Sequence, residues 1–225
     1  MKAIILLSGG LDSTTTLYCA RRDGWEPLCL TIHYGQRHHR EIVHAQRIAS
    51  HLQLENWVLP FLLPWGGSSL TEHQISLPKG RKEEEMTKEI PSTYVPFRNS
   101  IFLSLAVSLA EAKGAEAIYF GANALDYSGY PDCRPEFLET FETLVKQGSK
   151  TGTEGRRIQV KAPLLKLSKA EIVRLAHELG APMEWTWSCY EGGEFPCGQC
   201  DSCLLRAKGF REAGIEDPLL LKGTP

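Results

Sequence analysis

The chain alternates short apolar runs with stretches of helical periodicity. Runs at positions 3–7, 28–32, 57–61, 117–120 and 158–160 have the length and aliphatic character of buried strands. Helical patterns lie between and after them, at positions 14–20, 39–52, 99–113, 135–145 and 168–180. Because strands alternate with helices, the pattern predicts an α/β fold, a parallel sheet with helices on both faces. Such sheets bind ligands at the carboxyl ends of their strands.

Apolar spacing and end signals predict the core faces and the helix boundaries. Ser168 and Glu171 form a capping-box pattern, Pro135 suits the first turn of a helix, and Gly114 suits a helix end. The residues expected to face the core are Ile42, Ala45, Ala49 and Leu52, then Ile101, Phe102, Leu105 and Leu109, then Phe137, Leu138, Phe141, Leu144 and Val145.

The regular alternation is interrupted between Pro64 and Pro96. This stretch begins with Pro, Gly and Ser and is crowded with charge from Lys79 to Lys88. Connections of this length are typically lids, binding loops or disordered segments, so a mobile lid is expected here, with a tolerated surface insertion as the alternative. The predicted organisation is a nucleotide-binding domain over residues 1–182 and a C-terminal segment over 183–225 packed on it.

The composition fits one globular domain. The chain has 225 residues, of which 42% are hydrophobic and 23% charged, and a net charge of −2. This charge argues against a surface that holds nucleic acid by phosphate neutralisation alone, with a local basic patch as the alternative. The N-terminus lacks a signal-peptide pattern, and Ile101–Ala110 is too short to span a bilayer. A cytoplasmic protein with no membrane partner is expected.

The first apolar run leads into Leu7–Ser13, which reads Leu-Ser-Gly-Gly-Leu-Asp-Ser. A strand that turns through glycines into a helix offers free N–H groups to an anion, and Asp12 can hold a metal ion bound by phosphates. The spacing matches neither a Walker A loop nor a dinucleotide-binding loop. An ordinary capped turn is the alternative. The full string resembles the pyrophosphate loop of the ATP pyrophosphatases, which cleave ATP between its α and β phosphates to form adenylates.

Four of the seven cysteines cluster near the C-terminus. Cys189, Cys197, Cys200 and Cys203 have the spacing Cys-x7-Cys-x2-Cys-x2-Cys, which suits tetrahedral ligation by four thiolates. A structural Zn²⁺ site is expected, with an iron–sulfur cluster or a redox pair as alternatives. The metal would hold Leu204, Ala207 and Phe210 against the main domain. Cys19, Cys29 and Cys133 are expected to be small buried or loop residues, and of these Cys133 is a site candidate.

Three polar segments follow strands or begin helices. They are Tyr34–His38, Val95–Asn99 and Gly121–Arg134. The third combines glycines, tyrosines, carboxylates and an arginine, a composition that suits a planar heterocycle with an anionic group. Loop and helix-cap roles are the alternative for each single residue, but the joint placement at one sheet edge favours a substrate site.

Together these segments, the pyrophosphate loop and the four-cysteine tail resemble the 7-cyano-7-deazaguanine synthase family. The matches run from Leu7 to Cys203. The resemblance implies an adenine nucleotide alpha hydrolase-like fold, of the Rossmann-like class. It implies the ATP-dependent conversion of 7-carboxy-7-deazaguanine and ammonia to 7-cyano-7-deazaguanine, through an adenylated acid and an amide, in the queuosine pathway. One structural Zn²⁺ per chain, Mg²⁺ with ATP, a homodimer and no direct nucleic-acid partner are further implications.

The resemblance implies that the pyrophosphate loop holds ATP. Loop placement alone suggests that Arg98 or Arg134 neutralises the substrate carboxylate and that Asp126 or Asp132 contacts its guanine-like edge. Asp12, Arg98 and Arg134 are the expected catalytic residues. The expected ATP-binding residues are Leu7, Ser8, Gly9, Gly10, Leu11, Asp12, Ser13, Thr14, Thr15, Thr16 and Leu17. The expected substrate-binding residues are Tyr34, Gln36, Arg37, Arg98, Asn99, Asp126, Tyr127, Ser128, Tyr130, Asp132 and Arg134.

Two other functions remain open at this point. Another ATP pyrophosphatase, such as a tRNA-thiolating enzyme, would share the loop but act on nucleic acid. A non-catalytic zinc-ribbon module that retains a nucleotide fold would bind without turnover, and Asp12 in an intact phosphate loop argues against it.

Overall fold

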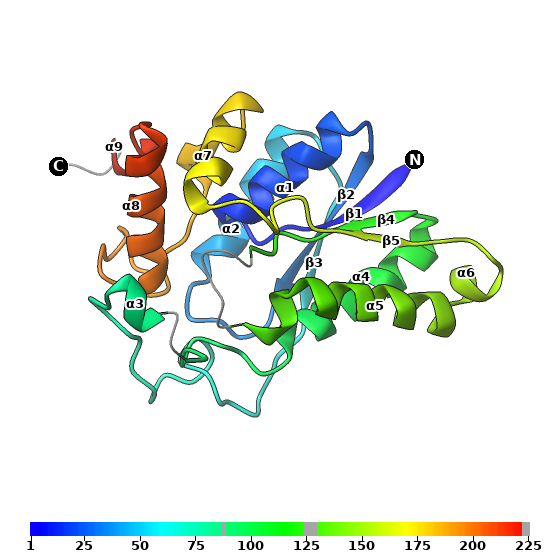
Figure 1. Ribbon diagram of the computed structural model, residues 1–225, viewed down its shortest axis with the longest axis horizontal. Coiled ribbons are helices and arrows are strands. Elements are labelled where there is room, and N and C mark those ends of the chain that lie inside the picture. Colours follow the sequence, from blue (N-terminus) through cyan, green and yellow to red (C-terminus); the bar gives the residue numbers. More distant parts are fainter. Residues whose placement is uncertain (87–88, 124–129, 222–225) are drawn as a thin grey trace.

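A five-stranded parallel sheet forms the centre of the computed structural model, which describes residues 1–86, 89–123 and 130–221 (Figure 1). The strands are β1 (Lys2–Leu6), β2 (Glu26–His33), β3 (Asn56–Pro60), β4 (Ala117–Tyr119) and β5 (Gln159–Lys161), in the order β3-β2-β1-β4-β5. Ile5 of β1 pairs with Cys29 of β2 on one side and with Tyr119 of β4 on the other. The predicted parallel sheet is confirmed.

Helices cover both faces of this sheet, as predicted. One face carries α1 (Leu11–Arg22), α2 (Arg40–His51) and α7 (Lys169–Glu178), and the other carries α4 (Arg98–Lys113) and α5 (Pro135–Gly148) (Figure 1). Ile5 and Leu7 pack into the first core, whereas Ile4 and Leu6 pack into the second. Because successive strand residues point to opposite faces, β1 contributes to both cores. The first turn of α7 has the predicted capping box, since Ser168 N donates to Glu171 Oε2 at 2.8 Å and Glu171 N to Ser168 Oγ at 3.3 Å.

Some predicted core faces differ from those observed. The deepest positions of α4 are Leu103, Ala106 and Ala110, whereas the predicted Ile101, Phe102, Leu105 and Leu109 flank them and are half-buried. This helix is apolar on nearly every side, so its spacing does not identify the line that meets the sheet. In α5, Leu144 is 59% exposed because the helix buries Leu138, Phe141 and Val145 instead. The predicted polar loop near Gly148 contains the short helix α6 (Lys150–Thr153).

The C-terminal part begins with a 3₁₀ turn, η2 (Met183–Trp185), and continues through α8 (Asp201–Ala213) and α9 (Pro218–Leu221). Helix α8 packs against α7 (Figure 1). Of the residues expected to be held there, Phe210 is buried in the first core and Leu204 is half-buried. Ala207 is exposed, because it lies on the outer side of α8.

The segment at 64–96, which contains α3 (Glu83–Met86), contacts its surroundings at several places, and Leu70 and Val95 are buried in the second core. Arg37 donates to the carbonyl oxygens of Glu72 at 2.6 Å and Ile75 at 2.8 Å. Further along, Arg81 pairs with the fully buried Asp201 at the start of α8. Among the described residues, no helix has the length and apolar content needed to cross a membrane.

Candidate active site

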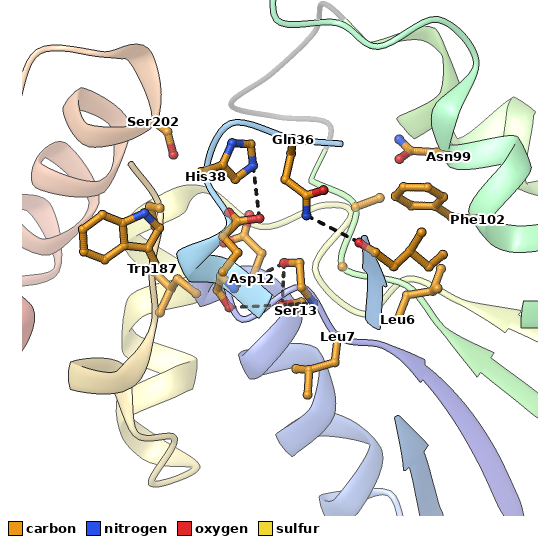
Figure 2. Close-up of a pocket in the computed structure, with 18 of the residues that line it drawn as sticks. Leu6, Leu7, Asp12, Ser13, Gln36, His38, Asn99, Phe102, Trp187 and Ser202 are labelled. Carbon is orange, nitrogen blue, oxygen red and sulfur yellow. Dashed lines mark hydrogen bonds and ion pairs between the residues drawn. The ribbon is translucent and has the colours of Figure 1, made fainter. Parts of the chain in front are cut away.

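A pocket of about 300 Å³ opens at the carboxyl ends of β1, β2 and β4. The chain leaves β1 toward β2 on one side and later returns to β4 on the other, so the pocket lies at the switch point of the sheet, where such folds bind ligands. Figure 2 shows Asp12 and Ser13 at its floor, Trp187 and Ser202 on one side, and Asn99 and Phe102 on the opposite side.

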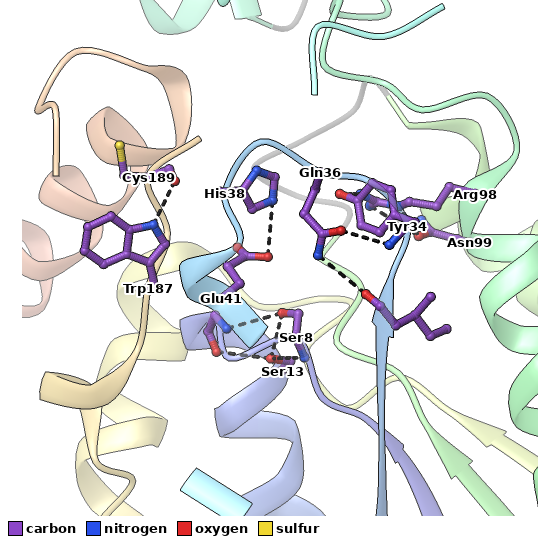
Figure 3. A network of polar contacts seen from close by, with 12 residues as sticks. Ser8, Ser13, Tyr34, Gln36, His38, Glu41, Arg98, Asn99, Trp187 and Cys189 are labelled. Carbon is purple, nitrogen blue, oxygen red and sulfur yellow. Dashed lines mark hydrogen bonds and ion pairs between the residues drawn. The ribbon is translucent and has the colours of Figure 1, made fainter. Parts of the chain in front are cut away.

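The floor is the loop between β1 and α1. Ser8 Oγ lies 3.0 Å from Ser13 Oγ and accepts from the N–H of Gly10 at 3.2 Å, which ties the loop to the start of α1 (Figure 3). Gly9 has φ +87°, and a Cβ there would overlap the carbonyl oxygen of Glu41 on α2. Only glycine therefore allows this close packing. The first N–H groups of a helix lack intrahelical partners, so the first turn of α1 can bind an anion.

Six of the residues expected to bind ATP line this pocket. They are Leu7, Ser8, Gly10, Leu11, Asp12 and Ser13. Thr14, Thr15, Thr16 and Leu17 are fully buried within α1 and do not line it. The Thr14 hydroxyl donates to the carbonyl of Gly10 at 2.8 Å, and that of Thr15 to the carbonyl of Leu11 at 2.8 Å. These side chains support the loop rather than face a ligand.

Asp12 is paired with Lys169, the first residue of α7. Lys169 Nζ lies 2.9 and 2.7 Å from the two carboxylate oxygens of Asp12, and both residues line the pocket. This lysine was not among the predicted site residues. Its neighbour Ser168 marks a helix start, but nothing in the sequence links Lys169 to a residue 157 positions earlier.

Arg98 forms part of the opposite wall. Its guanidinium lies 5.3 Å from the centre of the Tyr34 ring and 5.5 Å from that of Phe102, and donates to Tyr34 Oη at 2.9 Å (Figure 3). Burial disfavours its charge, but nearby acidic groups, Tyr34 and Asp132 among them, raise the pKa of Arg98. The preceding residue, Phe97, has φ +55°, a strained conformation of the kind that concentrates at functional sites. The wall therefore presents a permanent cation flanked by aromatic rings.

Asn99, Asp132 and Cys133 form a buried group behind Arg98. Asn99 N donates to Asp132 Oδ2 at 3.0 Å, and its side-chain amide to Cys133 Sγ at 3.2 Å. Asp132 does not line the pocket. Although it lies 33 residues later in the chain, its carboxylate accepts this hydrogen bond from the start of α4. Burial raises the pKa of Asp132 and raises that of Cys133 to about 12. Cys133 lines the pocket, but its thiol stays protonated near neutral pH and is a poor nucleophile.

The other predicted substrate residues separate into three groups. Tyr34, Gln36 and Tyr130 line the pocket, and Gln36 Oε1 accepts from the Tyr34 N–H at 2.9 Å. Arg37 and Arg134 do not line it: Arg37 holds the segment at 64–96, and Arg134 is exposed at the start of α5. Arg134 was expected in the pocket because its segment, Gly121–Arg134, was placed at the edge of the sheet. That placement does not fix the direction of the Arg134 side chain. Asp126, Tyr127 and Ser128 lie outside the described residues.

Several lining residues were not predicted from the sequence. Among them are Glu41, Lys169, Trp187, Ser188, Tyr190, Ser202, Leu205 and Arg206, whereas His38 belongs to the predicted polar segment Tyr34–His38. Arg206 is buried and bonded to Asp217, Thr186 and Met183, so it holds the C-terminal segment together. For Trp187 to Tyr190 a signal did exist, because Cys189 was a predicted metal ligand and its neighbours must lie near it.

The four C-terminal cysteines come together beside Trp187, on the side of the pocket opposite Arg98. Their Sγ atoms all lie within 4.8 Å of one another, a grouping that can hold a metal ion. Cys197 Sγ accepts from the N–H of Cys200 at 3.3 Å, and Cys189 Sγ from the N–H of Cys197 at 3.3 Å. Such N–H groups stabilise thiolate sulfur, so the donor set fits a tetrahedral metal. Cys19 and Cys29 are buried elsewhere, as expected.

Comparison with known proteins places the chain in one family. Residues 2–214 match the family model described as queuosine biosynthesis protein QueC. The 7-cyano-7-deazaguanine synthase of Trichodesmium erythraeum (strain IMS101) is 52% identical over 222 residues, covering 98% of this chain and all of that relative. The synthase of Gloeothece citriformis (strain PCC 7424) is 54% identical over 218 residues, covering 96% of this chain and 94% of that relative.

Among solved structures, the NMN synthetase from Francisella tularensis aligns with a TM-score of 0.49 and 17% identity, over 100% of this chain and 78% of that one. This structural similarity is weak. The family model and the curated relatives extend over nearly the full length at more than half identity. The chain therefore belongs to the QueC family of queuosine biosynthesis proteins.

Proposed function

We propose that this protein is an ATP-dependent 7-cyano-7-deazaguanine synthase, a ligase that forms a C–N bond. It converts 7-carboxy-7-deazaguanine and ammonia to the nitrile. The observation that carries the proposal is the full-length identity of 52% to a synthase of this name, in a chain whose pocket has a phosphate-loop floor and a cationic aromatic wall.

ATP is assigned to the floor of the pocket. The N–H groups at the start of α1 and the hydroxyls of Ser8 and Ser13 would hold its phosphates. Asp12 is the carboxylate that would hold Mg²⁺ there, and Lys169 would then be free to face the phosphates. The other expected ATP-binding residues, Gly9 and Thr14 to Leu17, keep the loop in shape.

The deazaguanine acid is assigned to the wall at Arg98. A permanent cation between the rings of Tyr34 and Phe102 suits a planar heterocycle that carries a carboxylate. Asn99 and Tyr130 offer polar contacts at the same wall. Asp132 supports Asn99. Arg134 and Arg37 do not line the pocket, so neither is assigned to the substrate.

The chemistry explains why ATP is needed. A carboxylate does not lose oxide to ammonia, so its oxygen must first become a leaving group. The substrate carboxylate attacks the α phosphate and pyrophosphate leaves; ammonia then displaces AMP to give the amide. In a second round the amide oxygen attacks a second ATP, and loss of AMP gives the nitrile. The protein contributes mainly positioning and charge stabilisation.

Zn²⁺ is the metal we assign to Cys189, Cys197, Cys200 and Cys203, as a structural ion. When bound, it would crosslink the C-terminal segment. We propose that this segment comprises residues 183–225 and packs on a catalytic domain at residues 1–182. We further propose that the segment at 64–96 moves as a lid. Free ammonia as the nitrogen source, a homodimer, a cytoplasmic location and no nucleic-acid partner complete the proposal.

Product analysis tests this function. The protein is incubated with 7-carboxy-7-deazaguanine, ATP, Mg²⁺ and ammonia, and the products are identified by mass spectrometry, with Asp12→Ala as the control. We expect the nitrile with the wild type and its loss in the variant. Pyrophosphate release without amide or nitrile would reject this substrate.

A further inference from the structure

Resting on that function, we infer that Glu41 is the general base that removes N–H protons in both rounds of the reaction. Glu41 lies in the first turn of α2 and lines the pocket beside the phosphate loop. No sequence motif marked it as a site residue, since it lies in the predicted helix at 39–52 and outside the pyrophosphate loop and the three polar segments. Its place in the pocket and its partners carry the inference.

Glu41 is held so that one carboxylate oxygen faces the loop. Its Oε2 lies 3.3 Å from His38 Nε2, and its side chain is only 15% exposed (Figure 3). Its Oε1 lies 4.0 Å from the position that a Cβ atom would take on Gly10. This oxygen is therefore next to the loop that would bind the α phosphate of ATP. The packing of the Glu41 backbone against Gly9 fixes the helix turn that carries it. A carboxylate oriented by a histidine is thus presented to the reacting centre.

The other carboxylate that lines the pocket is already engaged. Among the described lining residues only Asp12 and Glu41 carry carboxylates, and both oxygens of Asp12 lie within 3 Å of Lys169 Nζ. Cys133 has a pKa raised to about 12 by burial, so its thiolate is scarce. His38 is 2% exposed, its Nε2 faces Glu41, and its Nδ1 is buried. We therefore treat His38 as a positioning residue for Glu41.

The reaction needs such a base twice. In the first round ammonium gives one proton to Glu41, the nitrogen lone pair forms the C–N bond, the C–O bond to AMP breaks, and a second proton leaves the nitrogen. In the second round the amide nitrogen loses one proton as its oxygen is adenylated. Removal of the last N–H proton then turns that electron pair into the third C–N bond, and AMP leaves with the C–O electrons. Each proton passes from Glu41 to solvent.

Glu41→Gln separates this role from ATP binding, because the amide keeps the size of the side chain and can still contact His38. Hydroxylamine is the key probe. It is largely neutral near pH 7, whereas ammonia is almost entirely ammonium, so hydroxylamine can capture the acyl-adenylate as a hydroxamate without prior deprotonation. The three measured products are the hydroxamate from hydroxylamine, the amide from ammonia, and the nitrile from amide supplied directly with ATP. Glu26→Gln, exposed at the opposite end of β2, is the matched control.

We expect Glu41→Gln to form the hydroxamate within a few-fold of the wild-type rate, and to lose both amide formation and the amide-to-nitrile step by about 100-fold or more. The control should match the wild type in all three. Parallel loss of hydroxamate and pyrophosphate release would overturn the inference and make Glu41 an ATP or Mg²⁺ ligand. Wild-type rates of amide and nitrile would overturn it as well. A wild type that forms no product from this acid refutes the proposed function itself, and the inference with it.

Discussion

The N–H of Trp187 donates to the carbonyl oxygen of Gly9 at 2.9 Å, and its indole N–H donates to the carbonyl oxygen of Cys189 at 2.9 Å. One residue therefore joins the phosphate loop to the first residue of the four-cysteine cluster, and Figure 3 shows its indole bond to Cys189. The ring of Trp187 also packs on His44 of α2, with ring centres 5.6 Å apart. The four-cysteine cluster and the phosphate loop are thus adjacent parts of one packed unit.

Removal of the metal should weaken both folding and ATP binding. Structural Zn²⁺ contributes folding free energy directly, and a chain of this size loses about 2–4 °C of melting temperature per kcal/mol. We expect a chelator to lower the melting temperature by at least about 10 °C, which at this ratio corresponds to a loss of a few kcal/mol of unfolding free energy. Below that melting point, ATP affinity should fall as well, because Trp187 no longer holds Gly9. Unchanged melting and unchanged ATP affinity in a verified metal-free sample would contradict both points.

Gly9→Ala should destabilise the protein far more than Gly24→Ala. Both glycines have left-handed backbone, with φ of +87° and +80°, so strain is common to both variants. Only at Gly9 would the new methyl group also overlap Glu41 and Ala45, whereas nothing lies within 4 Å at Gly24. We expect a loss of about 1 kcal/mol for Gly24→Ala and at least about 3 kcal/mol for Gly9→Ala, measured by urea unfolding. Equal losses would show that the loop yields to the methyl group.

Lys169→Met should impair turnover while the fold persists. Methionine keeps most of the apolar stem, which packs near Gly209, but removes the charge that pairs with Asp12 and would face the phosphates. Loss of one such donor costs about 100-fold in rate. Steady-state kinetics of pyrophosphate release checks this, with Lys166→Met, exposed three residues earlier, as the control. A Lys169→Met enzyme with wild-type kcat/KM would place the lysine outside the reaction.

Stability should fall below about pH 6.5 through His44. Burial lowers the pKa of His44 from 6.5, and its Nδ1–H donates to the carbonyl of Trp185 at 2.5 Å. The unfolded chain binds the proton more readily than the folded one, so the free energy of unfolding declines as the pH falls from 6.5 through the lower folded-state pKa. His44→Asn should flatten this decline in urea titrations. The exposed His177→Asn should leave it unchanged. Identical pH profiles for His44→Asn and wild type would exclude His44 as the cause.

The sequence predicted those features that a short local string determines. The strand-loop-helix at Leu7–Ser13 and the four-cysteine spacing are of this kind, because each brings its own residues together. The face of α4 was not predictable, since an almost uniformly apolar helix can bury any side. Lys169 beside Asp12, Trp187 beside Gly9 and Glu41 beside Gly10 depend on packing between distant elements. No local spacing encodes such contacts.

Transfer of oxygen from the acid into the nucleotide shows whether the phosphate loop forms an adenylate. The substrate is 7-carboxy-7-deazaguanine labelled with ¹⁸O at both carboxyl oxygens, and the nucleotides are examined by mass spectrometry after complete conversion. If the phosphate loop adenylates the acid and then the amide, each nitrile should be accompanied by two molecules of AMP, each with one ¹⁸O. Label in inorganic phosphate with ADP as the nucleotide product, or unlabelled AMP, would contradict adenylation at this loop.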